Sequence, residues 1–184
     1  MPDRNEAVTF AVAAILTGGN ITVKGAQDTA LASFLEKLTE AGGGWEKVTN
    51  GIRFYSTGQK LKKTDVLISP HPGFMTDWQG PWTILMTQAK GVSTLHETVY
   101  ENRFTYVPEL RKMGAKITLF NPKVEDPKSF YNFNWEDNKP EYFHAIKITG
   151  PTPLESGIIT VPDLRAGATL VLAALVAGGK SILS

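Results

Sequence analysis

The stretch DLRAGATLVLAALVAGGKSIL, residues 163–183, has the order of a helix, a glycine turn and the start of a strand. It begins with an aspartate, a good N-cap, continues as a run of Ala, Leu and Val, and reaches a glycine sixteen residues after the aspartate. The same order occurs at residues 3–23, DRNEAVTFAVAAILTGGNITV, and at residues 77–95, DWQGPWTILMTQAKGVSTL. A helix of about four turns followed by a strand therefore recurs, and such a repeat fixes the architecture of a fold.

A second repeated piece extends this unit. Residues 35–45, LEKLTEAGGGW, and residues 107–117, VPELRKMGAKI, both read as short amphipathic helices that end at a glycine and lead into strands. The strand pairs that follow are WEKV with GIRFY, and KITLF with HAIKIT. The predicted unit is helix, strand, helix, strand, strand. Two copies are complete and the third stops after its first helix and the start of a strand, so we interpret the chain as a fragment.

The repeated helices indicate where the core lies. In residues 164–179, LRAGATLVLAALVAGG, nearly every position is small or aliphatic, and a helix that is apolar all round is expected to be buried on all sides. It is too short to cross a bilayer. Buried helices with strands between them predict an α/β fold in which the helices lie inside and the sheets outside.

Composition excludes several classes of protein. The 184 residues suffice for one substantial core or two small ones, and their formal charge of +1 is too small to attract nucleic acid or anionic lipid. There is no cysteine, and the histidines lack metal-ligand spacing, so neither a disulfide nor a metal site is predicted. The start, MPDRNEAVTF, has no signal-peptide pattern. We therefore expect a soluble, cytoplasmic protein with no membrane or nucleic-acid partner.

Four motifs carry a resemblance to a known family: PGFMTDWQ at 72–79, ETVYENRF at 97–104, VPELRKMGA at 107–115 and DLRAGA at 163–168. Together they resemble the enolpyruvyl transferases, and among these the UDP-N-acetylglucosamine 1-carboxyvinyltransferases, over nearly the whole chain apart from residues 121–143. The resemblance implies an inside-out α/β barrel of βαβαββ units, with buried helices and outer sheets. It also implies that residues 1–184 are a single truncated domain, the one formed mostly by the C-terminal half of such an enzyme.

The reaction of that family transfers enolpyruvate from phosphoenolpyruvate to the 3′-hydroxyl of UDP-N-acetylglucosamine and releases phosphate, the first committed step of peptidoglycan precursor synthesis. Its addition step needs a base for the hydroxyl proton, an acid for the methylene carbon, and cations for the phosphate and carboxylate. The resemblance implies these two substrates and no cofactor. It places the general acid and further nucleotide contacts on a second domain of the same protein, so this chain alone is expected to turn over nothing.

Asp77 is the first candidate catalytic residue. By its motif it resembles the carboxylate that contacts the sugar 3′-hydroxyl and is the proposed base, with Thr76 as a neighbouring substrate contact. Thr76 and Gln79 form a T-x-x-Q capping-box pattern, which predicts Asp77 in the first turn of a helix, where the dipole favours its ionised form. Pro81 comes late in that turn, so a kink is expected. The alternative is an ordinary helix-start carboxylate.

Arg103 and Val99 are candidates from the motif ETVYENRF. Arg103 resembles the family arginine that holds phosphoenolpyruvate, a role that suits a planar, always charged guanidinium. Its alternative is a surface ion pair with Glu101 or Glu109. Val99 matches a position whose backbone contacts the UDP-sugar, and its alternative is a β-branched core residue.

Asp163 and Arg165, in DLRAGA, match a pair at the active-site face of the family, with Asp163 near the reacting centre. The alternative is an N-cap and a first-turn arginine, since Arg4 occupies the equivalent place in the first repeat. We treat both residues as candidate catalytic groups.

Residues 121–143, NPKVEDPKSFYNFNWEDNKPEYF, interrupt the predicted strand pair that follows residue 115. Three prolines and four asparagines predict an inserted loop, and six aromatic residues indicate that it packs on something. We expect it to pack on the domain's own surface; contact with a partner is the alternative. For the whole chain, the alternative to an enzyme is a noncatalytic paralogue that keeps the fold and binds a nucleotide sugar or a protein partner. A shikimate-3-phosphate enolpyruvyl transferase is disfavoured by ENRF and VPELRKMGA.

Overall fold

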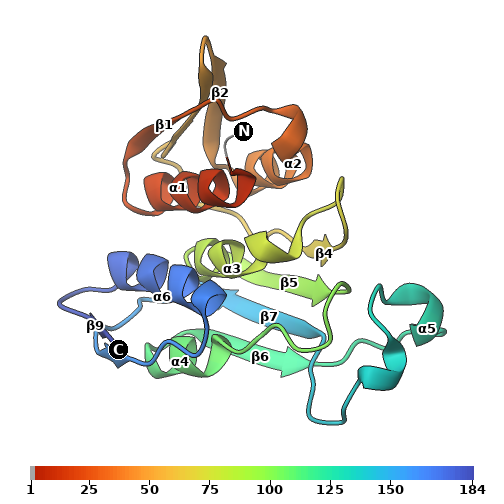
Figure 1. Cartoon of the computed structure of the whole chain (residues 1–184). Helices are drawn as coiled ribbons and strands as arrows, with labels where there is room; N and C mark the ends of the chain where they lie inside the picture. The colour runs from red at the N-terminus through yellow and green to blue at the C-terminus, as the bar shows by residue number, and fades with distance from the viewer. Residues whose placement is uncertain (1–2) are drawn as a thin grey trace.

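The computed structural model describes residues 3–184 (Figure 1). The helices are α1 (Arg4–Leu16), α2 (Ala32–Ala41), α3 (Gln79–Thr87), α4 (Val107–Lys112), α5 (Pro127–Phe130) and α6 (Leu164–Val176), with 3₁₀ turns η1 (Thr29–Leu31), η2 (Thr76–Trp78) and η3 (Trp135–Asp137). The strands are β1 (Asn20–Lys24), β2 (Gly44–Val48), β3 (Gly51–Tyr55), β4 (Val66–Ile68), β5 (Gly91–Glu97), β6 (Lys116–Phe120), β7 (Ala145–Gly150), β8 (Ile158–Ile159) and β9 (Ile182–Leu183). Within this described part, no helix combines the length and apolarity needed to span a bilayer.

The first predicted unit is present as α1, β1, α2, β2 and β3. Its strands form an antiparallel sheet in the order β1-β3-β2, and β2 pairs with β3 as predicted, with Val48 opposite Gly51. Helices α1 and α2 pack against this sheet. The fully buried side chains of Ile52 and Phe54 alternate with less buried ones along β3, and Phe54 meets Phe34 of α2 edge-on, so the sheet has one face in the core.

The second unit forms a mixed sheet of four strands in the order β4-β5-β7-β6. Strands β6 and β7 pair antiparallel as predicted, β5 pairs antiparallel with β7, and β4 lies parallel to β5. The short strands β4 and β8 were not predicted. With β4 included, the second unit reads β4, α3, β5, α4, β6, β7, and the parallel pair β8 and β9 flanks α6 in the chain.

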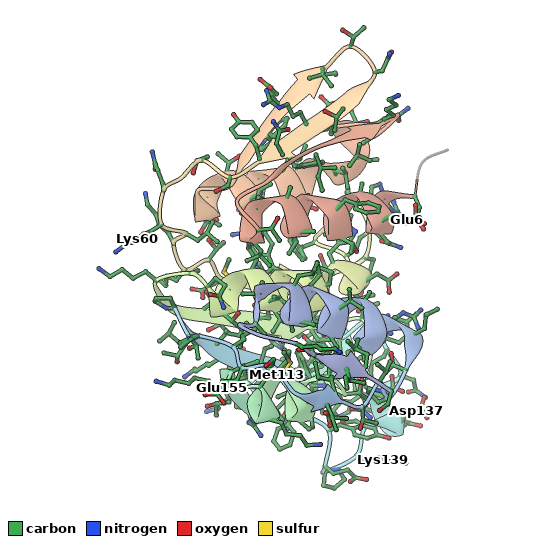
Figure 2. All side chains as sticks on the ribbon, turned by 90° about the vertical axis from the view of Figure 1, so that its left-hand side faces the viewer. Glu6, Lys60, Met113, Asp137, Lys139 and Glu155 are labelled. Atoms are coloured by element: carbon green, nitrogen blue, oxygen red, sulfur yellow. The ribbon has the colours of Figure 1, made fainter. Side chains whose placement is uncertain are left out.

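The helices predicted from the three repeats, α1, α3 and α6, contact one another. They lie between the three-stranded sheet and the four-stranded sheet, and side chains fill the space between these layers (Figures 1 and 2). Every residue of α3 is buried. By contrast, Lys60 is exposed, and Figure 2 shows its side chain extending away from the ribbon.

The expectation that the helix at 164–176 is buried all round is wrong. One side of α6 is buried through residues such as Leu170 and Ala173, while Leu164, Val171 and Leu175 are 91%, 48% and 56% exposed. The sequence could not show this exposed side, because a uniformly apolar helix carries no polar face that would mark it. Composition therefore predicted that this helix contributes to the core, but not which of its sides faces the core.

Segment 121–143 packs on the domain's own surface, as predicted. It contains α5 and η3 and lies beyond the ends of β5 and β6 (Figure 1). Tyr131, only 6% exposed, stacks on Trp135 with ring centroids 4.9 Å apart and tilts against His144 at 4.8 Å. The aromatic residues of the segment thus cover one another and the start of β7.

Candidate active site

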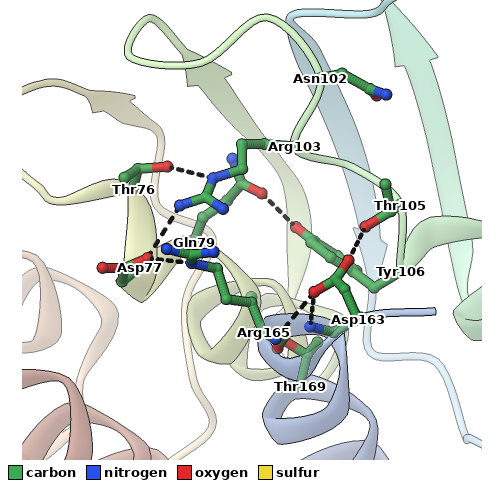
Figure 3. A pocket seen from close by; sticks show the side chains of 12 residues that line it. Thr76, Asp77, Gln79, Asn102, Arg103, Thr105, Tyr106, Asp163, Arg165 and Thr169 are labelled. Atoms are coloured by element: carbon green, nitrogen blue, oxygen red, sulfur yellow. Dashed lines mark hydrogen bonds and ion pairs between the residues drawn. The ribbon is translucent and has the colours of Figure 1, made fainter. Parts of the chain in front are cut away.

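A pocket of about 70 Å³ lies where the start of α3, the loop before α4 and the start of α6 meet (Figure 3). Its walls are Thr76, Asp77, Gln79, Gly80, Asn102, Arg103, Thr105, Tyr106, Asp163, Arg165, Ala166 and Thr169. Four residues singled out from the sequence as catalytic candidates therefore meet in one place, although they come from three segments. Most of the lining side chains are polar or charged.

A glycine allows the second and third repeats to approach so closely. Gly80 lies in the first turn of α3, and a Cβ atom there would come within 1.9 Å of Thr169 Oγ1 on α6. A larger residue there would require the Thr169 side chain to shift or α6 to move away from α3. The close packing of these two helices brings Arg165, in the first turn of α6, beside Asp77.

Asp77 accepts hydrogen bonds from two arginines on the same oxygen. Arg103 Nη2 donates to Asp77 Oδ1 at 3.0 Å and Arg165 Nε donates to it at 2.9 Å. The other oxygen, Oδ2, has only a long contact of 3.5 Å with Asn5 Nδ2. The Asp77 side chain is 28% exposed, and its Oδ2 lies on the side of Asn5 rather than of the two arginines.

The predicted capping box does not form. Asp77 lies in the 3₁₀ turn η2, before α3 begins at Gln79, and neither Thr76 nor Gln79 caps a backbone N–H of α3. Both side chains instead donate to Glu97 Oε2 at 2.7 Å. Pro81 is the third residue of α3, and the N–H that it lacks would have had no partner within that helix.

Glu97, at the end of β5, is the organising carboxylate that the sequence interpretation missed. It is 1% exposed, and its Oε1 accepts the N–H groups of Val99 at 2.6 Å and Tyr100 at 3.3 Å. Burial raises the pKa of Glu97 above its ordinary value, although these hydrogen bonds and the charge of Arg103 oppose the shift. The alternation of β5 contained the signal, because Glu97 shares the buried face with Ser93.

Arg103 is held in place on several sides. Besides its bond to Asp77, its Nε donates to Thr76 Oγ1 at 3.2 Å, and its guanidinium lies 4.3 Å from the centre of the Tyr100 ring. Its side chain is 16% exposed. The alternative prediction of an ion pair with Glu101 or Glu109 is wrong, since the recorded ion pair joins Arg103 to Asp77.

Asp163 both caps α6 and lines the pocket. Its Oδ1 accepts the N–H groups of Arg165 and Ala166 at 2.9 Å each, and its Oδ2 accepts the hydroxyl of Thr105 at 2.9 Å. The pKa of Asp163 is lowered, first by the Ala166 N–H and also by Thr105 and the charge of Arg103. The N-cap interpretation is confirmed, and both oxygens already have donors.

Val99 does not line the pocket, and its N–H is bonded to Glu97. A second missed residue is Tyr106, a buried residue of the pocket wall whose hydroxyl donates to Gln79 Oε1 at 3.1 Å. Burial raises the pKa of Tyr106, so this side chain is a neutral donor. Within residues 3–184 there is no cluster of His, Cys, Asp and Glu that could hold a metal ion.

The sequence matches known enzymes along its whole length. The pattern that defines EPSP synthase (3-phosphoshikimate 1-carboxyvinyltransferase) matches residues 1–183. The chain is 42% identical over 184 residues to UDP-N-acetylglucosamine 1-carboxyvinyltransferase of Protochlamydia amoebophila and covers 38% of that protein. It is 35% identical over 184 residues to the protein of the same name from Brucella ovis, again covering 38% of it. The chain thus spans well under half the length of these curated relatives.

Two solved structures share the fold. All of the chain superposes on 38% of the enolpyruvyl transferase NikO from Streptomyces tendae, with a TM-score of 0.80 and 25% identity. For EPSP synthase from Acinetobacter baumannii the match covers 99% of the chain and 39% of that enzyme, with a TM-score of 0.65 and 16% identity. Both enzymes have an α/β fold with mixed sheets, as this chain has.

Proposed function

Because this chain belongs to the EPSP synthase family, we propose that it is part of an enolpyruvyl transferase that acts on UDP-N-acetylglucosamine. Two observations support the proposal, and the first of them supports the choice of substrate. The curated relatives of 42% and 35% identity both bear the name UDP-N-acetylglucosamine 1-carboxyvinyltransferase. The pocket also offers two guanidinium groups for an anion and a carboxylate oxygen for a proton. On this proposal the product enters peptidoglycan precursor synthesis.

The observation that carries the proposal is the shared oxygen of Asp77. Arg103 and Arg165 both donate to Oδ1, and guanidinium groups bind phosphate and carboxylate oxygens equally well. When phosphoenolpyruvate enters, the two arginines turn to its anionic groups and release Asp77. The carboxylate then takes the proton of the sugar 3′-hydroxyl while that oxygen bonds to C2 of phosphoenolpyruvate. A group elsewhere in the complete protein protonates the methylene carbon, so that the C2–C3 double bond becomes single. In the elimination, that carbon loses a proton, the double bond reforms and the C2–O bond to phosphate breaks, which expels phosphate.

The other candidates have supporting roles in this proposal. Asp163 holds the start of α6, and therefore Arg165, at the pocket. Thr76 contacts substrate next to Asp77, because it lines the pocket. A contact from the Val99 backbone to the UDP-sugar would have to use the carbonyl oxygen, since its N–H is bonded to Glu97.

The fold proposal is an inside-out barrel. Residues 1–184 form one domain of βαβαββ units, with segment 121–143 as an insertion between β6 and β7. The mutual contacts of α1, α3 and α6, and the complete second unit from β4 to β7, support it. A second domain of the same protein would supply the general acid and further contacts to the nucleotide.

The test is phosphate release by the complete protein. With phosphoenolpyruvate, UDP-N-acetylglucosamine should support release, whereas shikimate 3-phosphate should not. Release with shikimate 3-phosphate alone would favour the other substrate, which the name of the matching family pattern suggests. No release with either acceptor would leave a noncatalytic paralogue and contradict the proposal.

A further inference from the structure

Segment 121–143 forms hydrogen bonds with Thr98, in the chain just before the candidate site residue Arg103. The main-chain N–H of Asn132 donates to the carbonyl oxygen of Thr98 at 2.6 Å. The side-chain Nδ2 of the same asparagine donates to Thr98 Oγ1 at 3.0 Å. Thr98 is 2% exposed and lies between Glu97 and Val99. A residue far from the pocket therefore binds the chain directly next to the organising carboxylate.

The loop that Asn132 binds carries Arg103. We call residues 98–104, which connect β5 to the turn before α4 without regular structure, the site loop. Individual bonds hold its beginning: Glu97 accepts two of its N–H groups on the pocket side, and Thr98 Oγ1 donates to the Ile68 carbonyl oxygen of β4 at 2.7 Å. A loop without a ladder of backbone bonds depends on such contacts for its position.

Packing of aromatic rings fixes Asn132 itself. Its neighbour Tyr131 is buried, stacks on Trp135, and shares a hydrogen bond of 3.1 Å with His96 Nε2 on β5. Phe130 stacks on the imidazole of His96, with the two ring centroids 5.2 Å apart. The two residues directly before Asn132 are therefore anchored on β5, next to the bonds to Thr98. An asparagine held in this way can restrain the loop that it binds.

We propose that segment 121–143 supports the site loop and that Asn132 is a positioning residue for Arg103. Glu97 restrains the start of the loop from the pocket side, and Asn132 restrains it from the opposite side. Arg103 lies five residues after Thr98 in the same loop. Greater mobility of the backbone at Thr98 should therefore make the Arg103 guanidinium more mobile. The effect on catalysis rests on the proposed function, whereas the effect on the loop does not.

Hydrogen exchange in the complete protein tests the structural part. Asn132→Ala should speed exchange of the Val99 and Tyr100 amides roughly three- to tenfold, the effect of losing one hydrogen bond of ordinary strength. Asn134→Ala is the matched control, because Asn134 lies in the same segment and, among the described residues, its side chain bonds only the Glu136 N–H of η3, at 3.2 Å. Asn132→Asp is a second variant. It should speed exchange at least as much, because its carboxylate would face the Thr98 carbonyl.

Phosphate release tests the catalytic part. Asn132→Ala should raise KM for phosphoenolpyruvate roughly three- to tenfold with little change in kcat, and Asn134→Ala should change neither. Unchanged exchange in both Asn132 variants would overturn the supporting role of the segment. Faster exchange with unchanged KM would overturn the positioning role of Asn132. If the wild-type protein releases no phosphate, the proposed function fails, and the exchange result still decides whether the segment supports the loop.

Discussion

Arg165 and Asp77 are 88 residues apart in the sequence, yet Arg165 Nε donates to Asp77 Oδ1 at 2.9 Å. This bond joins the third repeat to the second at the mouth of the pocket. Since Arg103 donates to the same oxygen, two positive side chains converge where an anion would bind. The pair is therefore the centre of the proposed site, and Arg165, with 64% of its side chain exposed, is free to turn toward a ligand.

The first prediction concerns Arg103. In the complete protein, Arg103→Ala should lower kcat/KM for phosphoenolpyruvate by about 2 to 4 kcal/mol in transition-state terms, because a charge-assisted contact is lost. Arg103→Lys should restore only part of this, since an ammonium cannot make the planar two-point contact. Steady-state kinetics measures both.

The control for Arg103 is Arg53→Ala. Arg53 also makes an ion pair, with Glu46 at 2.7 Å, but on the exposed face of the three-stranded sheet. Its loss should leave the kinetics unchanged. Equal kinetics for the Arg53 and Arg103 variants would reduce Arg103 to a structural ion pair.

The second prediction concerns Glu97. Glu97→Gln should destabilise the protein by about 1 to 3 kcal/mol, because the NH2 group that replaces one carboxylate oxygen cannot accept a hydrogen bond, and one of the two pairs of donors on Glu97 loses its acceptor. Urea unfolding measures this loss. The same variant should lower kcat/KM, since Thr76 and the site loop lose a shared anchor. A variant as stable and as active as the wild type would show that the buried carboxylate organises nothing.

The pH dependence of that variant follows from the raised pKa of Glu97. A carboxyl group with a higher pKa in the folded state contributes stability that is complete below its ordinary pKa of 4.5 and is lost as the pH rises through the folded value. The stability difference between the wild type and Glu97→Gln should therefore shrink over that interval. A difference that grows with pH would mean that the folded protein favours the ionised form.

The third prediction concerns His96. Burial lowers its pKa from 6.5 to about 4, and the charge of His144 contributes. NMR titration should therefore show a midpoint near 4, and Phe130→Ala should move it upward because the stacked ring no longer shields the imidazole. A wild-type midpoint near 6.5 would show that segment 121–143 does not cover His96.

The repeats predicted much of the fold, because a helix that starts at an aspartate and ends near a glycine is visible in a single sequence. The β2–β3 and β6–β7 pairs were predicted because each follows a repeated short helix that ends at a glycine. Strands β4 and β8 were missed because three and two residues show no periodicity. The exposed side of α6 was missed because Leu164 and Leu175 have the same apolar character as its buried residues.

For the site, motifs identified Asp77, Arg103, Asp163 and Arg165, and the structure brings their side chains together. Local patterns could not identify their partners. Thr76 and Gln79 fit a capping box, but the carboxylate of Glu97, at the end of β5, accepts both of their donors. Such a tertiary contact overrides a local preference without leaving a signal in neighbouring residues.

The most direct test of the proposed function is phosphate release by the complete protein carrying Asp77→Asn, with Asp3→Asn as the matched control. Asp3 is the equivalent residue of the first repeat and caps α1, and asparagine caps helices well, so this control should keep full activity. Asp77→Asn should lose roughly two to four orders of magnitude in kcat, because the amide cannot take the hydroxyl proton, with a melting temperature close to that of the wild type. An Asp77→Asn protein that releases phosphate at the wild-type rate would contradict the account.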